Sequence, residues 1–451
     1  MIETTLRELY KFGPGPSSSH TMGPMLAGHD FYKLMQNLDP ALLAQAKRLK
    51  IVLLGSLSAT GKGHGTDRAV VAGVLGQVPA HCPPEFLDQL ASDRYRPYPL
   101  EIGPFRTQLA VDDVVYGATV GHFHHPNTLR LSLEGEGPTP ILEREYYSVG
   151  GGFIEWKGYQ PPPKPTPPYP YSNCRELMSH VTPQRDLYQV LLANEMALTG
   201  QTEEQVLAFV QDVISVMRNA AHHGLERSGL LPGSLQLQSK AQRLFKNYQD
   251  EGGPFADRAL SAVTALAIAV SEENARGHVI CTAPTAGSAG VMAGTVHALA
   301  SRHRRNLRRL REGIVVGAAI GYLCKNNATI SGAEGGCQAE VGVAAAMTAA
   351  LLVHYRGGSA RSIENAAESA LEQHLGLTCD PVGGYVQIPC IERNAFGLIK
   401  AWTASIISPD NLSSSHKVDL DSCIEAMRLT AAAMSSKYKE TSRGGLAQVL
   451  C

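Results

Sequence analysis

The sequence predicts an α+β protein with a mixed N-terminal α/β domain over residues 1–160, a proline-rich linker over 161–171 and a mostly α-helical C-terminal domain over 172–451. Its 451 residues, 44% of them hydrophobic, are enough for two or three domains with their own cores. Seven prolines in the twelve residues from Gln160 to Tyr171 can sustain neither a helix nor a sheet ladder, so they mark a boundary. Across it the apolar runs change from short and interrupted to long and alanine-rich.

Before the linker, the apolar segments have the length and composition of strands. Arg48–Leu54 and the region Leu109–Leu133 carry short runs of Val, Ile and Leu, interrupted by Gly, Pro and Asn. This pattern favours strands mixed with a few helices. The linker itself predicts a stiff polyproline II spacer.

After the linker, long apolar runs predict helices. Several are apolar on all sides, as in Ala259–Val270, so we expect them to lie buried inside a bundle. Gly357 and Gly376 follow two of these runs and are expected as helix C-caps. The predicted helices are Thr202–Asn219, Ala256–Asn274, Ala286–Ala300, Gly313–Leu323, Glu340–Tyr355, Ser362–Leu375 and Asp419–Ser436.

Composition excludes several classes of function. Forty basic and forty-one acidic residues give a net charge of −1, so there is no overall electrostatic attraction for nucleic acid or an anionic membrane. The first residues lack the apolar core of a signal peptide. The longest uncharged apolar stretch, Val341–Tyr355, is shorter than the roughly 18 to 20 residues that cross a bilayer. Nine cysteines, an odd number, favour reduced thiols or metal ligands, and we expect a soluble, cytoplasmic protein.

Three cysteines in the helical half lie beside glycine or proline. These are Cys337 after Gly-Gly, Cys379 before Asp-Pro, and Cys390 after Ile-Pro, positions typical of turns at the ends of elements. One interpretation is three buried structural thiols. The other is three thiolates on a cubane iron–sulfur cluster, which leaves one iron open to bind a substrate. Zinc prefers four ligands with paired C-x-x-C spacing, which this sequence lacks.

Strings along nearly the whole chain closely resemble the bacterial iron–sulfur-dependent L-serine dehydratases, in their single-chain form. In order, they are Gly15-Pro-Ser-Ser-Ser-His-Thr21, Thr60-Gly-Lys-Gly-His-Gly-Thr-Asp67, His125-Pro-Asn-Thr128, Tyr147-Ser-Val-Gly-Gly-Gly-Phe153, Ser331–Gly342, Gly376–Gly384, Val386–Asn394 and Lys439-Glu-Thr-Ser-Arg-Gly-Gly-Leu446. The resemblance implies that Cys337, Cys379 and Cys390 hold a [4Fe-4S] cluster. It also implies β-elimination from L-serine, giving pyruvate and ammonia, with the active site between the two domains.

The resemblance and the residue types together suggest how a small amino-acid substrate is handled. His64 and His125, in Gly- and Pro-rich turns expected on exposed loops, are candidates for acid–base catalysis, and His20 for binding the substrate carboxylate. Ser17, Ser18, Ser19 and Thr21 either cradle a carboxylate or cap a helix. Further candidates for substrate binding are Asn127, Thr282, Thr285, Lys439 and Arg443.

The last residue, Cys451, follows two glycines and a short apolar segment. Members of the family resemble this chain in having a cysteine at or near the C-terminus. The implied role is a metal ligand that occupies the open iron until substrate displaces it. The alternative is a solvated thiol without a role.

Four positions depart from the family pattern, namely Pro14, Ala286, Gly335 and Ala339. They leave threonine or cysteine open as substrates. Two further alternatives stand beside the dehydratase. Ser414-Ser-His-Lys417 superficially resembles a pyridoxal phosphate lysine motif but has no accompanying phosphate cradle. The chain could also be a noncatalytic sensor of amino acids, which would not need the three cysteines. The many apolar helices favour a homodimer.

Overall fold

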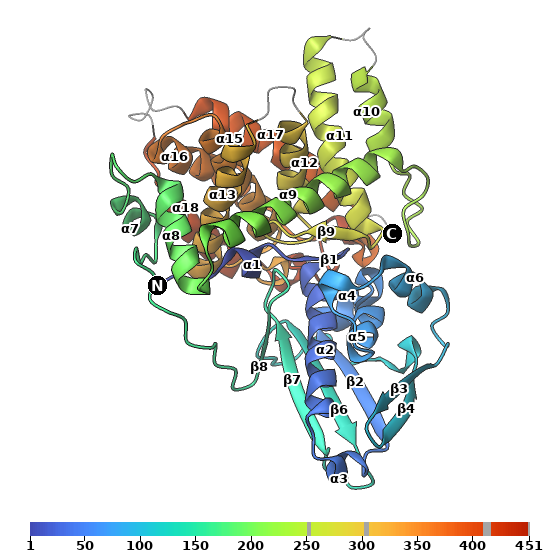
Figure 1. Ribbon diagram of the computed structural model, residues 1–451. Helices are drawn as coiled ribbons and strands as arrows, with labels where there is room; N and C mark the ends of the chain where they lie inside the picture. Colours follow the sequence, from blue (N-terminus) through green and yellow to red (C-terminus); the bar gives the residue numbers. More distant parts are fainter. Residues whose placement is uncertain (250–253, 302–305, 409–415, 450–451) are drawn as a thin grey trace.

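The computed structural model describes residues 1–249, 254–301, 306–408 and 416–449, and it forms two lobes (Figure 1). The lower lobe, here the mixed unit, comprises residues 11–156. The upper lobe, here the helical unit, comprises residues 174–449 together with the first ten residues of the chain. A region with sheet and helices is therefore followed by a mostly helical region, as the sequence predicts.

The mixed unit is built on a five-stranded sheet in the order β5-β2-β6-β7-β8. Only β2 and β5 pair in parallel; the other neighbours in this sheet are antiparallel. Leu129, Leu131 and Leu133 of β6 alternate onto the buried face, as expected for a sheet covered on one side. The strands are β2 (Arg48–Gly55), β5 (Val115–Tyr116), β6 (Asn127–Glu134), β7 (Leu142–Ser148) and β8 (Ile154–Trp156), with a separate hairpin of β3 (Tyr98–Ile102) and β4 (Phe105–Leu109).

Helices α2 and α5 supply the apolar side chains that pack with this sheet in one core. In Figure 1, α2 runs along the sheet and α4 and α5 lie at the end that faces the helical unit. The helices of this unit are α2 (Gly23–Gln36), α3 (Pro40–Leu43), α4 (Ser56–His64), α5 (Thr66–Val74) and α6 (Pro84–Ser92), with short turns η1 (Ser18–Met22), η2 (Pro79–His81) and η3 (Val111–Asp113).

The helical unit is a bundle around α15, whose residues from Val343 to His354 are all buried. Its long helices are α8 (Leu187–Thr199), α9 (Glu203–Glu226), α11 (Phe255–Ala275), α12 (Ala289–Ala300), α13 (Leu307–Asn327), α15 (Val343–Tyr355), α16 (Ala360–Glu372), α17 (Cys390–Ile407) and α18 (Leu420–Ala433). Its shorter elements are α7 (Cys174–Ser179), α10 (Ala241–Gln249), α14 (Gly332–Gly335), η4 (Gln338–Gly342), η5 (Val382–Gly384), η7 (Ser436–Tyr438) and α19 (Leu446–Val449).

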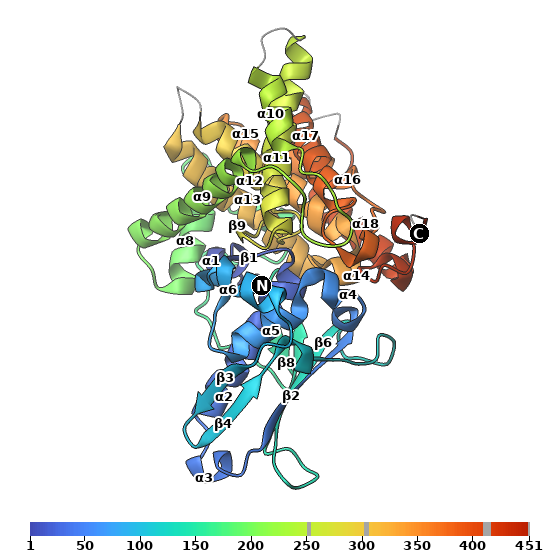
Figure 2. The ribbon, with the colours of Figure 1, turned by 90° about the vertical axis from the view of Figure 1, so that its right-hand side faces the viewer.

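Each predicted helix of this half has a counterpart, with two corrections. The expectation that the run Ala259–Val270 is buried throughout is wrong for its first half, because this part of α11 projects beyond the bundle beside α10 (Figures 1 and 2). Gly357 has a φ of +85° just after α15 and acts as the expected C-cap residue. Gly376 also has a positive φ, of +82°, but α16 ends earlier, at Glu372.

The first ten residues join the two units. The short helix α1 (Leu6–Leu9) and Tyr10 pack into the core of the helical unit. The chain then forms β1 (Phe12–Pro14), which pairs antiparallel with β9 (Val279–Cys281) of the helical unit. Residues 157–173, all of them described, return to the helical unit without forming a helix or strand. Among the described residues, no helix combines the length and apolarity required to cross a membrane.

Candidate active site

Cys337, Cys379 and Cys390 line one small cavity at the junction of the two units. Cys337 lies between α14 and η4, and Cys390 is the first residue of α17, so both lie at the ends of elements as predicted. Cys379 lies within the loop between α16 and η5. All three are buried free thiols. The cavity is completed by Pro16, Ser17, His64, Gly287, Glu340, Val341, Pro381, Val386 and Glu440.

A glycine brings the first two cysteine segments together. Gly336 has a φ of +74°, and a Cβ there would lie 2.7 Å from the carbonyl oxygen of Leu377. Any side chain would therefore both strain the backbone and separate the Cys337 turn from the Cys379 segment. The C-terminal segment joins the other side, since Cys379 N–H donates to the Tyr438 carbonyl and Glu440 N–H donates to the Cys379 carbonyl, each at 2.8 Å.

The three thiols differ in acidity. A hydrogen bond from the Cys379 thiol, with the nearby Arg393 guanidinium, lowers the pKa of Cys337 to about 7 although burial opposes it. That hydrogen bond and burial raise the pKa of Cys379, and burial raises the pKa of Cys390. Arg393 holds the set in place: its Nη1 lies 3.2 Å from Cys337 Sγ and its Nη2 lies 3.1 Å from an oxygen of Asp380.

The pairing of β1 with β9 brings the residues that follow β1 to the wall of this cavity. Gly15 N–H donates to the His278 carbonyl at 3.1 Å, and the amide of Asn274 donates to the Pro16 carbonyl at 2.7 Å. A Cβ on Gly15 would lie 2.0 Å from the carbonyl oxygen of Asn274. The close approach permitted by this glycine places Pro16 and Ser17 at the cavity wall.

His64 has the geometry of a proton acceptor. Its Nδ1 lies 2.9 Å from the Thr60 carbonyl oxygen, so Nδ1 carries the proton and Nε2 keeps its lone pair. Nε2 is buried without a hydrogen bond, in a side chain that lines the cavity. Burial lowers the pKa of His64 to about 4, so the imidazole is neutral at physiological pH.

The other two candidate histidines differ from His64 in the groups that their nitrogens face. The Ser56 hydroxyl donates to the Glu440 carbonyl, so its oxygen accepts from His20 Nε2 at 3.0 Å. His20 Nδ1 then accepts from the Ser19 hydroxyl, also at 3.0 Å. His125 does not line the cavity. Its Nδ1 accepts from Asn127 N–H, and its Nε2 lies 3.3 Å from Glu334.

The expectation that these histidines lie on exposed loops is wrong. His64 ends helix α4, His20 lies in the turn η1, and both are fully buried, because the glycines around them let two units pack closely. A Cβ on Gly63, for example, would lie 2.5 Å from the carbonyl oxygen of Gly384 across the junction.

In the serine-rich segment, the structure confirms the helix cap, and carboxylate binding stays a prediction. Ser17 lines the cavity and also caps η1 by accepting from His20 N–H. The other hydroxyls bind the protein: Ser18 accepts from Ala286 N–H, and Thr21 donates to the His64 carbonyl. Of this group, Ser17 is the one that lines the cavity, among the residues that the structure describes.

The remaining candidates for substrate binding do not line the cavity. Thr282 donates to the Leu9 carbonyl, and Asn127 donates to the Ser148 carbonyl. Arg443 is exposed and donates to the hydroxyl of Thr119 in the mixed unit. Thr285 lies behind the cavity wall, where its hydroxyl hydrogen-bonds to the lining residue Glu340. Lys439 pairs through its backbone with Cys379.

Two other sequence motifs are only partly described. Cys451 lies outside the described residues, and so do Ser414 and Ser415 of the motif Ser414–Lys417. Lys417 itself is exposed and lines a different cavity, with Arg361 and Asp419. Cys281, Cys324 and Cys423 lie in the core of the helical unit, as expected.

Two of the unusual positions touch each other. A Cβ on Gly335 would lie 2.7 Å from the Cβ of Ala339. The methyl group of Ala339 therefore fits because position 335 is a glycine. Ala286 is buried, and neither it nor this pair lines the cavity. These three departures therefore lie outside the wall of the cysteine cavity.

Sequence reasoning missed Glu440. Its side chain is buried in the cavity, with Oε1 lying 3.4 Å from His20 Nδ1 and 3.6 Å from His64 Nε2. Burial and the nearby Glu340 raise the pKa of Glu440, and burial raises the pKa of Glu340 to about 8. The only signal for Glu440 was its place beside Lys439 in a family motif, where it looked like one more surface charge.

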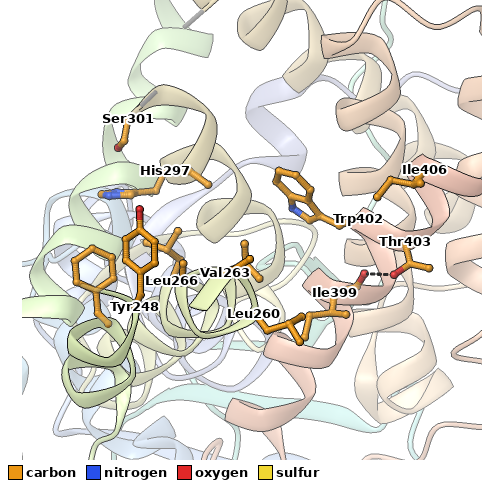
Figure 3. A pocket seen from close by; sticks show the side chains of 14 residues that line it. Tyr248, Leu260, Val263, Leu266, His297, Ser301, Ile399, Trp402, Thr403 and Ile406 are labelled. Atoms are coloured by element: carbon orange, nitrogen blue, oxygen red, sulfur yellow. Dashed lines mark hydrogen bonds between the residues drawn. The ribbon is translucent and has the colours of Figure 1, made fainter. Parts of the chain in front are cut away.

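A second, wider cavity is apolar (Figure 3). It lies between α10, α11, α12 and α17, and Figure 3 shows Leu260, Leu266 and Trp402 along its wall. None of its lining residues is a cysteine, aspartate or glutamate. The groups that can perform chemistry therefore gather in the cysteine cavity.

Three thiols, a neutral histidine and two glutamates, buried together where the mixed unit meets the helical bundle, form a candidate active site. Comparison with known families agrees: the model of the serine dehydratase beta chain matches residues 5–159, and that of the alpha chain matches residues 183–447. The chain belongs to the serine dehydratase family.

Relatives of known name match along their whole length. The chain is 38% identical to an L-serine dehydratase of Streptomyces coelicolor, over 98% of this chain and 97% of the relative. It is 38% identical to L-serine dehydratase 2 of Escherichia coli over the same shares, and 35% identical to the L-serine dehydratase of Helicobacter pylori over 100% of both chains.

Proposed function

We propose that this protein is an L-serine dehydratase, which converts L-serine to pyruvate and ammonia by β-elimination. The observation that carries the proposal is the convergence of three buried thiols and the unprotonated Nε2 of His64 on one cavity. The family and its full-length relatives support the choice of L-serine as substrate.

The cofactor we propose is a [4Fe-4S] cluster held by Cys337, Cys379 and Cys390. The donor set fits, because thiolates are the ligands that iron–sulfur clusters prefer and none of the three is consumed in a disulfide. The ligand atoms of Cys337, Cys379 and Glu340 all lie within 4.8 Å of one another. The Arg393 guanidinium beside Cys337 would offset part of the negative charge of such a site.

A terminal ligand is also compatible with the structure. Leu446 N–H, in α19, donates to Asp380 at 2.8 Å, which anchors the last described turn beside Cys379. We propose that Cys451, two residues beyond that turn, occupies the fourth iron in the resting enzyme and leaves when substrate binds.

The reaction needs a proton removed from Cα and a hydroxide expelled from Cβ. When bound, the cluster supplies a Lewis acid for the hydroxyl and carboxylate of the substrate. His64 Nε2 accepts the Cα proton, and Oε1 of Glu440, 3.6 Å away, faces the imidazolium that results. Ser17 offers a hydroxyl to orient the substrate at the cavity wall. Loss of hydroxide leaves 2-aminoacrylate, which becomes the imine and hydrolyses to pyruvate and ammonia.

We further propose residues 1–160 and 172–451 as the two domains, joined by the proline-rich linker over 161–171, and a homodimer in solution. Exposed apolar side chains on α11 and α17, two of the helices around the second, wider cavity, support the dimer: Phe255 is 86% exposed and Ile406 is 64% exposed. Sedimentation of the protein and of Ile406→Glu tests it. The eight described cysteines are all free thiols, which supports a reducing compartment such as the cytoplasm.

Anaerobic assay of pyruvate formation tests the proposed function. The protein purified without oxygen should form pyruvate from L-serine, and 2-oxobutanoate from L-threonine more slowly. Cys337→Ser should lose activity and iron, whereas Cys423→Ser, at a buried cysteine of the core, should keep both. Full binding of amino acids without turnover would favour a sensor instead.

A further inference from the structure

Glu440 combines three unusual properties. It is a non-glycine residue with a φ of +56°, its side chain is buried, and its Oε2 has no hydrogen-bond partner. A backbone in the left-handed region is costly for a residue with a side chain and persists only where its surroundings hold it. Those surroundings are the hydrogen bonds of its N–H to Cys379 and of its carbonyl to Ser56. Both neighbours fix this carboxylate in the cavity.

The two oxygens of Glu440 have different environments. Oε1 faces His20 and His64, at 3.4 and 3.6 Å. Oε2 has no such neighbour, although a carboxylate oxygen buried without a donor is strongly unfavourable. The structure therefore leaves one acceptor unused inside the cavity.

The cavity also lacks a cation. Its lining contains two carboxylates and three thiols, and none of the described lining residues is a lysine or arginine. Arg393, the nearest cation to the thiols, already binds Cys337, Asp380 and the carbonyl of Thr378. A ligand that enters this cavity is thus favoured if it brings a positive charge.

Glu340 is less suited to receive that charge. It already accepts a hydrogen bond from Thr285, and its ligand atom lies close to those of Cys337 and Cys379. It therefore lies on the side of the cavity where the thiols converge. Glu440 instead has its Oε1 3.6 Å from His64 Nε2.

We propose that Oε2 of Glu440 accepts a hydrogen bond from the α-ammonium group of the substrate, and so makes the enzyme select α-amino acids over hydroxy acids of the same shape. This inference rests on the proposed function for the identity of the substrate. It assigns Glu440 to substrate binding, with the ammonium placed beside the histidine that faces Cα.

The test compares L-serine with L-glycerate, which carries a hydroxyl in place of the ammonium. In the anaerobic holoenzyme, the KM for L-serine should be at least tenfold below the inhibition constant of L-glycerate. Glu440→Gln should raise the KM for L-serine at least tenfold and change the inhibition constant of L-glycerate by less than twofold. Glu334→Gln, which removes a carboxylate paired with His125 outside the cavity, should change neither constant.

Two results overturn the inference. One is equal affinity of the unmodified enzyme for the two ligands, a measurement that needs no variant. The other is a Glu440→Gln protein, with normal iron content and thermal unfolding, in which both constants rise together or neither changes. If the unmodified enzyme binds L-serine in preference to L-glycerate by calorimetry but forms no pyruvate, the proposed function fails and this inference stands.

Discussion

Replacing Arg393 by Met removes the cation that links two of the cysteine segments while keeping most of the apolar stem. The guanidinium lies 2.6 Å from the Thr378 carbonyl, 3.1 Å from Asp380 and 3.2 Å from Cys337 Sγ. Hydrogen bonds to charged groups each contribute about 1.5 to 3 kcal/mol. The sum overstates the loss, because Asp380 keeps hydrogen bonds from the Thr378 hydroxyl and from Leu446 N–H.

Breaking a buried ion pair from one side costs about 3 to 5 kcal/mol, and we expect Arg393→Met to lower the free energy of unfolding by that amount. Arg393→Lys, which keeps a charge for Asp380, should lose about half as much. The assay is denaturant unfolding of the anaerobic protein together with its iron content. A Met variant that unfolds within about 1 kcal/mol of the parent and keeps its iron would refute the reasoning, since the loss of a buried partner is expected to exceed this.

Three further predictions follow from the site. His64→Asn should lower kcat by about a hundredfold or more, the usual contribution of a general base, whereas His125→Asn should lower it less than tenfold; equal losses in pyruvate formation would contradict the assignment. His374 is buried with its pKa lowered to about 4, so between about pH 6.5 and 4 the unfolded chain binds a proton that the folded chain does not. His374 should therefore contribute about 3 kcal/mol to the stability lost as pH falls through that window, and His374→Gln should reduce this slope in unfolding measured from pH 7 to 4; an unchanged slope would show that another group is responsible. Cys451→Ser should lower the KM for L-serine and shorten the half-life of the cluster in air. If neither quantity changes, Cys451 is not a ligand of the cluster.

The sequence was most informative where pattern alone determines structure. Short runs of Val, Ile and Leu indicated strands in the regions where β2 and β6 lie, and long alanine-rich runs indicated the helices around α15. It predicted no helix where α17 (Cys390–Ile407) lies, since the prolines and glycines before Cys390 resemble a loop. The exposure of the first part of α11 depends on which other helices pack against it, and the local sequence does not encode this (Figure 2).

The site was predicted in composition and only partly in arrangement. Cys337, Cys379 and Cys390 were found because glycine and proline beside each one indicated turns. His64 and His125 looked equivalent in sequence and are distinguished only by the atoms that their nitrogens face. The role of Glu440 could not be predicted from the sequence, because a glutamate that follows a lysine usually lies in solvent. Its burial comes from contacts to residues 56 and 379, which are remote in sequence.

The most direct test is the visible absorption and electron paramagnetic resonance of the protein purified without oxygen, recorded with and without L-serine. The proposed account predicts the broad visible absorption of an iron–sulfur cluster and a resonance signal that L-serine perturbs, because the substrate binds at the open iron. A colourless protein that cannot be reconstituted with iron and sulfide, or a cluster whose signal ignores L-serine, would contradict it.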